Sequence, residues 1–146
     1  MVLKVNNPPR TVTRFEEYRH VVKCRVGSGD GGRCLADGNE VMRFYCVGPT
    51  AGAIYDMSGL CEFSGKNRTI CTYSGSGRAH ESFGGGKGRR AMLVCRVIAG
   101  RVCKRLGVES FLEGRVGFDS VSGDNGELFV FDSRAVLPCF LIIYKP

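Results

Sequence analysis

The spacing of apolar residues predicts one helix near the start of the chain. Along TRFEEYRHVVKCR the apolar side chains recur at helical spacing, at Phe15, Tyr18 and Val22. A threonine followed three residues later by a glutamate is typical of a helix N-terminus, and Thr13 and Glu16 stand in that relation. We therefore expect a helix over 13–25 with its apolar face packed against the rest of the protein.

The remaining apolar runs are short and predict strands. They occupy residues 40–47, 68–73, 91–102, 127–132 and 139–144. The run over 91–102 is rich in β-branched residues, so we expect 92–100 to form a central strand that is buried on both faces. Its expected neighbours are the strands near Phe44 and Phe129. Pro138 is expected to bend the chain between the last two strands.

This order of elements predicts the fold class. One clear helix followed by five or six strands is typical of an α+β or mostly-β domain with largely antiparallel sheets. We expect two facing sheets with the first helix packed on one side. Residues 51–57 and 78–83 are expected to be short helical segments, and the glycines within 27–32 and 84–88 predict loops. Residues 1–146 show no linker or repeat and therefore predict a single domain.

Composition and charge constrain where the chain acts. It carries a net charge of +7, and no apolar segment approaches the ~20 residues of a membrane span. It begins without a signal-peptide core, so we expect no membrane association and an intracellular location, nuclear or cytoplasmic. The densest basic run, GKGRR, lacks the interleaved aromatic residues of a dedicated nucleic-acid binder. The charge favours a solvated basic face, with weak, salt-sensitive nucleic-acid contact as the alternative.

The chain has eight cysteines, and their spacing predicts no metal site. No two of them form a C-x-x-C pair, and no histidine pair follows at zinc-finger distance. Cys95 and Cys139 lie inside apolar runs, so we expect both to be buried, reduced and unligated. Neither His20 nor His80 lies in a recognisable nucleophile motif, so a catalytic Cys–His pair is not expected.

The order of motifs resembles a known enzyme family. AMLVCRVIAGRV, GFDSVSG and GELFVFDSRAVLPCFLIIYK follow one another as in the catalytic domain of poly(ADP-ribose) polymerases, or PARPs. Upstream, FYCVGPTAG stands where the family has its W-H-G-T strand, and RTICTYSGSGRAH stands where it has G-I-Y-F-A and K-S. ADGNE, SGRAH and RRAMLVCRVIAGRV are similar to plant PARP-like proteins, some with a zinc finger outside this region. The likeness spans roughly 40–145 and implies the ADP-ribosyltransferase fold, a split, twisted β-core of two mostly antiparallel sheets with few helices.

The resemblance implies an NAD site, because the family transfers ADP-ribose by breaking the nicotinamide–ribose bond of NAD. Tyr45 stands at the family's His, which bonds the adenosine-side ribose, and Cys71 stands at the Tyr that stacks near nicotinamide. Glu127 matches the family's Glu, which bonds the nicotinamide-side ribose and polarises the acceptor. These three positions are therefore the triad equivalents. Without the resemblance, Glu127 is also typical of an exposed residue at the start of a strand.

Three further positions correspond to the family's remaining NAD contacts. Cys46 stands at the Gly whose backbone holds the nicotinamide amide, and Ala79 stands at the Ser that bonds the carboxamide. Ser82 stands at a second stacking Tyr, or Phe83 does if the register shifts by one. Tyr45 adds a bulky ring at the ligand's place, whereas Cys71, Ala79 and Ser82 remove stacking surfaces and a hydrogen-bond partner.

These changes predict a degenerate site. Losing a buried hydrogen bond costs about 1–3 kcal/mol and losing an aromatic stack about 0.5–1.5 kcal/mol. With four of five side-chain roles altered, the summed loss exceeds ~5 kcal/mol, or three decades of affinity. We predict a PARP-like domain without ADP-ribosyltransferase activity or bound cofactor, acting as a protein-interaction or regulatory module with a protein partner. The alternatives are an active NAD-dependent mono-ADP-ribosyltransferase with a rebuilt Tyr45, Cys71 and Glu127 site, and a basic nucleic-acid-associated domain.

Overall fold

In a computed structural model of the chain, the structure describes residues 1–25, 36–49, 70–82, 88–104 and 118–145. The segment predicted to be helical at 51–57 and most of the two glycine loops lie outside these residues. The elements, in chain order, are β1 (Val2–Lys4), α1 (Pro9–Arg25), β2 (Glu40–Pro49), β3 (Ile70–Tyr73), α4 (Ser76–Glu81), β4 (Arg90–Ile98), β5 (Val102–Lys104), β6 (Ser120–Ser122), β7 (Glu127–Val130), the 3-10 helix η1 (Ser133–Ala135) and β8 (Val136–Tyr144). Among the described residues, no helix combines the length and apolar character needed to cross a membrane.

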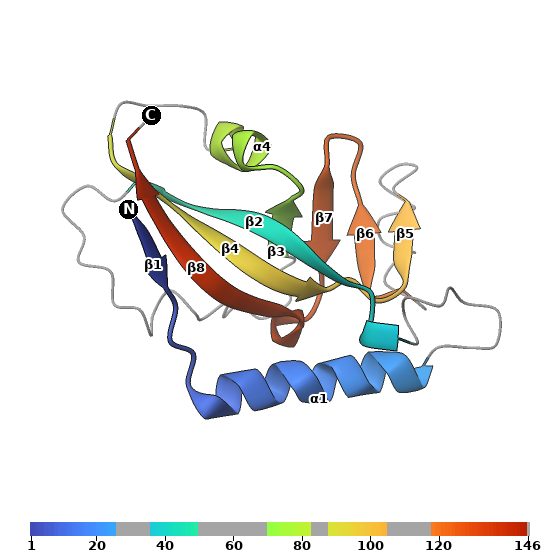
Figure 1. Cartoon of the computed structure of the whole chain (residues 1–146). Coiled ribbons are helices and arrows are strands. Elements are labelled where there is room, and N and C mark those ends of the chain that lie inside the picture. Colours follow the sequence, from blue (N-terminus) through green and yellow to red (C-terminus); the bar gives the residue numbers. More distant parts are fainter. Residues whose placement is uncertain (26–35, 50–69, 83–87, 105–117, 146) are drawn as a thin grey trace.

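The strands in the described part of the chain form one eight-stranded sheet in the order β1-β8-β4-β2-β3-β7-β6-β5. All neighbouring pairs are antiparallel except β5 with β6. The α+β class and the largely antiparallel pairing are therefore confirmed. The prediction of two sheets is wrong, because β2 and β3 join the two halves through one residue pair in register, Phe44 opposite Tyr73. In Figure 1, β8, β4 and β2 run obliquely, whereas β7, β6 and β5 stand upright.

The central strand β4 lies between β2 and β8 and is mostly buried. Its pairing with the strand of Phe44 is confirmed, since Phe44 lies opposite Val94. Its expected pairing with the strand of Phe129 is wrong, because Phe129 lies on β7 opposite Cys71 of β3. An apolar run gives a strand's burial but not its neighbours, which depend on how the whole chain folds. The strand also ends at Ile98, two residues before the predicted end.

Pro138 lies inside β8 and does not separate two strands. The register between β4 and β8 shifts there, with Val94 opposite Phe140 and Cys95 opposite Pro138. This β-bulge accommodates a proline, which cannot donate a ladder hydrogen bond. Cys139 occupies the extra position and is half-buried, so its predicted full burial is wrong, whereas the burial of Cys95 is confirmed.

Helix α1 begins one turn earlier than the sequence pattern predicted. It starts at Pro9, and the amides of Thr11 and Val12 donate to the Pro8 carbonyl at 2.9 and 3.3 Å. Proline suits the first helical position because its φ is preset and its missing N–H needs no partner there. The predicted N-terminus at Thr13 is therefore wrong, since Thr13 lies inside the helix. The short helical segment predicted at 78–83 is α4, which begins two residues earlier.

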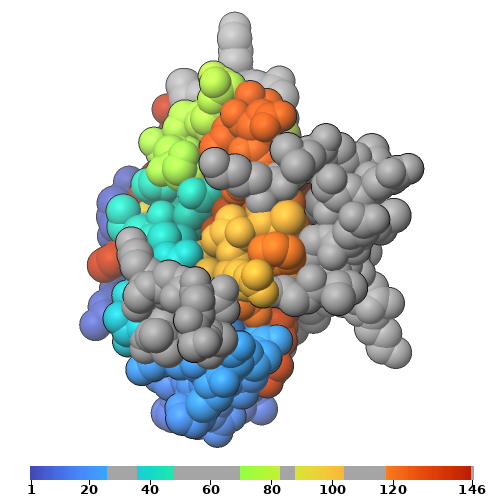
Figure 2. Space-filling view, turned by 90° about the vertical axis from the view of Figure 1, so that its right-hand side faces the viewer, coloured from blue at the N-terminus to red at the C-terminus, as the bar shows by residue number. Residues whose placement is uncertain are grey.

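Two apolar clusters hold the elements together. The larger includes the predicted buried face of α1 and the inward residues of β4: Phe15, Tyr18, Val22, Leu93, Cys95 and Val97. The smaller consists of Cys46, Ala79 and Met92, where α4 meets β2 and β4. Figure 2 shows α1 and α4 at opposite ends of one face of the molecule, with strands between them.

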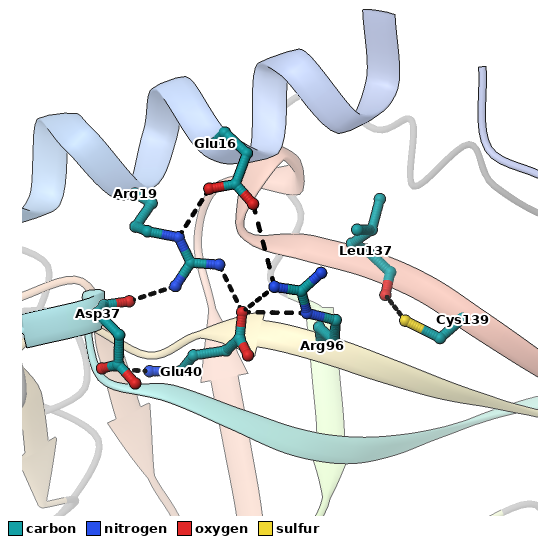
Figure 3. Close-up of polar contacts among 7 residues, drawn as sticks. All are labelled: Glu16, Arg19, Asp37, Glu40, Arg96, Leu137 and Cys139. Carbon is teal, nitrogen blue, oxygen red and sulfur yellow. Dashed lines mark hydrogen bonds and ion pairs between the residues drawn. The ribbon is translucent and has the colours of Figure 1, made fainter. Parts of the chain in front are cut away.

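A network of charged side chains fixes α1 to β2 and β4 (Figure 3). Arg19 of α1 and Arg96 of β4 both donate to Glu40 of β2, at 2.5 and 2.8 Å, and Arg19 also donates to Glu16 at 2.9 Å. Both guanidinium groups lie over the Phe15 ring, 5.2 and 5.3 Å from its centroid. The Glu40 carboxylate thus joins α1 and β4 to β2, and the cation–π contacts add to its ion pairs.

Candidate functional site

Five of the six predicted site residues lie on β2, β3, α4 and β7, and Ser82 directly follows α4. These elements lie near the join between the two halves of the sheet. Their side chains do not all share one face. Tyr45 packs against the larger cluster, whereas Cys46 and Ala79 belong to the smaller one. Consecutive strand residues point to opposite faces, so the side chains of Tyr45 and Cys46 cannot both line one cleft. The site must therefore be described face by face.

Tyr45 is half-buried on the face of the larger cluster. Burial raises the pKa of its hydroxyl, and the nearby thiols of Cys95, Cys46 and Cys71 raise the pKa further. The phenol is therefore neutral at physiological pH. Immediately after this pair the β2–β4 register shifts, between Cys46 and Gly48. A β-bulge thus lies directly beside the position that the resemblance aligns with the family's His-Gly pair.

Cys71 and Glu127 lie on the opposite face, beside α4. On β3, buried Ile70 and Thr72 alternate with Cys71 and Tyr73, and Tyr73 packs against the smaller cluster. Glu127 lies opposite Tyr73 in the β3–β7 ladder and so shares that face. The structure therefore places Cys71 and Glu127 on the same face of the sheet as Cys46 and Ala79, whereas the side chain of Tyr45 lies on the other face.

The thiol of Cys71 is a weak nucleophile in this setting. Burial raises its pKa most, and the Glu127 carboxylate raises it too, outweighing the hydrogen bond with Tyr73 and the charge of Arg43. The hydrogen bond with Cys71 is in turn the main reason that the pKa of Tyr73 rises to about 12. Since the thiolate is the reactive form of cysteine, a protonated Cys71 cannot serve as an activated nucleophile.

The remaining predicted positions are engaged within the protein. Ala79 is fully buried, and Cys46 is 3% exposed. The Ser82 hydroxyl donates to the Ala79 carbonyl at 2.6 Å, at the C-terminus of α4. The Glu127 carboxylate accepts from the Asn125 backbone amide at 3.1 Å, closing the turn that precedes β7. Each of these groups has an intramolecular role at a position that the resemblance aligns with a ligand contact.

Arg43 lies beside the candidate positions, and the sequence analysis did not single it out. Its guanidinium donates to the Thr72 hydroxyl at 3.1 Å, the Thr72 carbonyl at 3.0 Å and the Gly126 carbonyl at 2.6 Å. It therefore ties β2 to β3 and to the β6–β7 turn, beside the registered pair Phe44–Tyr73. Burial lowers its pKa. The position of an arginine inside the apolar run MRFYCV could have indicated its role.

Two further pairs of polar side chains are in contact, and the sequence analysis predicted neither contact. His80 Nδ1 and the Tyr144 hydroxyl lie 2.7 Å apart, and the two rings meet edge-on. Cys24 Sγ and His20 Nε2 lie 3.5 Å apart on the exposed face of α1. A spacing of four residues on a helix places two side chains on one face, which could have indicated the second pair. Among the described residues, no group of three or more His, Cys, Asp or Glu side chains is arranged to hold a metal ion.

Comparison with protein-family models finds no match for the chain, and comparison with curated proteins finds none either.

Proposed function

We propose that this chain is a degenerate PARP-like domain of the ADP-ribosyltransferase fold, without ADP-ribosyltransferase activity, that acts as a protein-interaction or regulatory module. One observation carries the proposal: side chains at the positions equivalent to the NAD site are used for internal packing and internal hydrogen bonds. Tyr45 packs against the larger cluster, Cys46 and Ala79 are buried, and Ser82 and Glu127 bond to backbone groups. No cofactor is required by this function.

The split between the two faces argues against the rebuilt enzyme as the main function. An active mono-ADP-ribosyltransferase needs Tyr45 and Glu127 to contact one NAD molecule, but these residues pack on different faces of the sheet. Cys71 does not compensate, because burial raises the pKa of its thiol and keeps it protonated. The experimental test must therefore distinguish a degenerate domain from an active mono-ADP-ribosyltransferase.

A partly exposed apolar row supports a protein partner. Phe140 of β8, Val94 of β4 and Phe44 of β2 lie directly opposite one another and share one face. Phe140 is 44% exposed, and Met42, two residues along β2 from Phe44, is 65% exposed. Contiguous apolar side chains on a sheet face are typical of interaction surfaces. A protein partner inside the cell, in the nucleus or cytoplasm, fits this surface better than the nucleic acid suggested by the net charge of +7.

Labelled NAD provides the test. The purified domain is incubated with NAD labelled on the adenylate, and auto-modification and release of nicotinamide are measured against an active ADP-ribosyltransferase. We expect neither product above a no-protein control. If the wild type modifies itself and Glu127→Gln abolishes the reaction, the rebuilt-site alternative is correct. A Glu81→Gln variant, which changes an exposed carboxylate of α4, controls for loss of a charge.

A further inference from the structure

The outward face of α1 carries a pair of metal-ligating side chains that the proposed function does not use. Phe15, Tyr18 and Val22 form the buried face of the helix, and His20 and Cys24 lie on the opposite face. Both side chains are exposed, and they are one helical turn apart. In Figure 1 the sheet lies above α1, so this face is the outermost part of the described structure at the bottom of the molecule.

The geometry of the pair matches two ligands of one zinc ion. Cys24 Sγ and His20 Nε2 are separated by 3.5 Å. Zinc binds sulfur at about 2.3 Å and imidazole nitrogen at about 2.0–2.1 Å, which at a tetrahedral angle places the two ligand atoms about 3.6 Å apart. The two side chains can therefore bind one ion without a change of backbone.

The described part of one chain supplies two of the four ligands of a structural zinc site. Such sites have four protein ligands, commonly two cysteines and two histidines, and the described residues contain no third or fourth ligand near this pair. In a two-fold symmetric dimer both subunits contribute the same surface patch to the interface. If α1 forms that patch, His20 and Cys24 are supplied once by each subunit. A second copy of this chain therefore completes a tetrahedral set of two sulfur and two nitrogen ligands.

The surface around the pair suits a second helix. Val12 and Val21 flank the outward face and are 38% and 41% exposed. A shallow groove of about 610 Å³ runs along the same face and is lined by Val12, Thr13, Glu16, Glu17, His20 and Val21. Apolar side chains beside the ligands would be covered when two α1 helices meet, which adds burial to the metal bonds.

We propose that α1 is a zinc-dependent homodimerisation element, in which His20 and Cys24 of two copies bind one Zn²⁺ ion. Each thiol loses its proton when its sulfur binds the metal, so two protons are released for each ion bound. Neither sulfur is oxidised, and no reductant or oxidant takes part. The proposal is independent of the proposed function, since His20 and Cys24 lie on the outward face of α1, opposite the face that packs in the larger cluster.

Cobalt and light scattering test the proposal on the full chain under a phosphine reductant. We expect Co²⁺ to give a thiolate charge-transfer band and the visible bands of tetrahedral coordination, saturating at one ion for two chains. Zn²⁺ should displace Co²⁺ from the dimer. Light scattering should give the mass of a monomer for the metal-free chain and twice that mass with either metal, and EDTA should restore the monomer. A 1:1 end point on a monomer, or a dimer that forms without metal, would overturn the proposal.

Matched variants locate the ligands. Cys24→Ser and His20→Gln should each abolish the zinc-dependent dimer. Each should also weaken Co²⁺ binding by more than about 10–100-fold, which is the usual effect of removing a group that only hydrogen-bonds to a metal ligand. Circular dichroism establishes that these exposed substitutions leave the fold intact. Cys139→Ser, Cys34→Ser and Cys61→Ser should keep the dimer. If Cys34→Ser or Cys61→Ser abolishes the dimer while Cys24→Ser does not, the site lies elsewhere and the proposal is wrong.

Discussion

Replacing Arg43 by methionine tests how the two halves of the sheet are held together. The substitution keeps an unbranched apolar side chain but removes three hydrogen bonds to Thr72 and Gly126. Hydrogen bonds from a charged group contribute about 1.5–3 kcal/mol each, and the cost of burying the guanidinium offsets much of that sum. We therefore expect the free energy of unfolding to fall by about 2 kcal/mol.

Two features of the acceptors keep the expected loss from being larger. The Gly126 carbonyl also accepts from the Ser74 amide at 3.1 Å, and the Thr72 hydroxyl also donates to the Leu128 carbonyl at 3.0 Å. These groups therefore retain partners in the variant, so the full penalty of an unsatisfied buried acceptor does not apply. For a domain of this length, a loss of about 2 kcal/mol lowers the melting temperature by about 4–8 °C.

Urea unfolding followed by circular dichroism measures the loss, and hydrogen exchange locates it. Exchange should accelerate in β3 and β7 more than in β8, because Arg43 joins the first two strands to β2. Arg78→Met is the control, since Arg78 is exposed and its ion pair with Glu81 is 3.8 Å long. If the two variants unfold within about 0.5 kcal/mol of each other, Arg43 does not hold the halves together.

Three further outcomes follow from the same structure. Burial raises the pKa of Glu40, but hydrogen bonds from Arg96 and Arg19 outweigh it and hold the pKa below its usual 4.5. Because the pKa of Glu40 is lower in the folded state, the stability advantage of wild type over Glu40→Gln should be complete above about pH 5. The advantage should disappear as the pH falls through the folded-state pKa, and urea unfolding at a series of pH values measures it. Leu93→Ala, at a fully buried position of β4, should lower the free energy of unfolding by about 2–5 kcal/mol, whereas Leu3→Ala on the exposed strand β1 should change it much less; equal losses would mean that the larger cluster is not the core. A thiol reagent should modify Cys24 rapidly and Cys95 only after unfolding, and all eight thiols should react in denaturant without reductant; rapid native modification of Cys95 would contradict its burial.

The sequence pattern predicted those parts of the fold that depend on local periodicity. The buried face of α1 and the burial of β4 follow from where apolar residues recur, and both are confirmed. Strand neighbours depend on the whole chain, so the pattern could not predict that Phe129 pairs with Cys71. The start of α1 was predicted at Thr13, but Pro9 is a stronger signal for the first position of a helix and lies earlier in the chain, so the helix begins there.

The site itself stays a prediction, and the structure bears only on how the assigned positions are arranged. The resemblance assigned positions on β2, β3, α4 and β7, and these elements are neighbours near the β2–β3 join. The two-residue period of a strand already implies that the side chains of Tyr45 and Cys46 face opposite ways. The contacts of Arg43 and of the Cys24–His20 pair could not be predicted from the sequence, because hydrogen bonds across strands and contacts along a helix face depend on side-chain directions.

Isothermal titration calorimetry with NAD is the most direct test of whether this chain retains a nucleotide site. A loss of ~5 kcal/mol or more would weaken a micromolar site to a Kd in the millimolar range or beyond, so we predict no saturable heat for the wild-type domain. Tyr45→His should not restore binding, because one hydrogen bond returns about tenfold in affinity at most. A saturable isotherm with a micromolar Kd for the wild type, reduced by Glu127→Gln, would contradict the degenerate site.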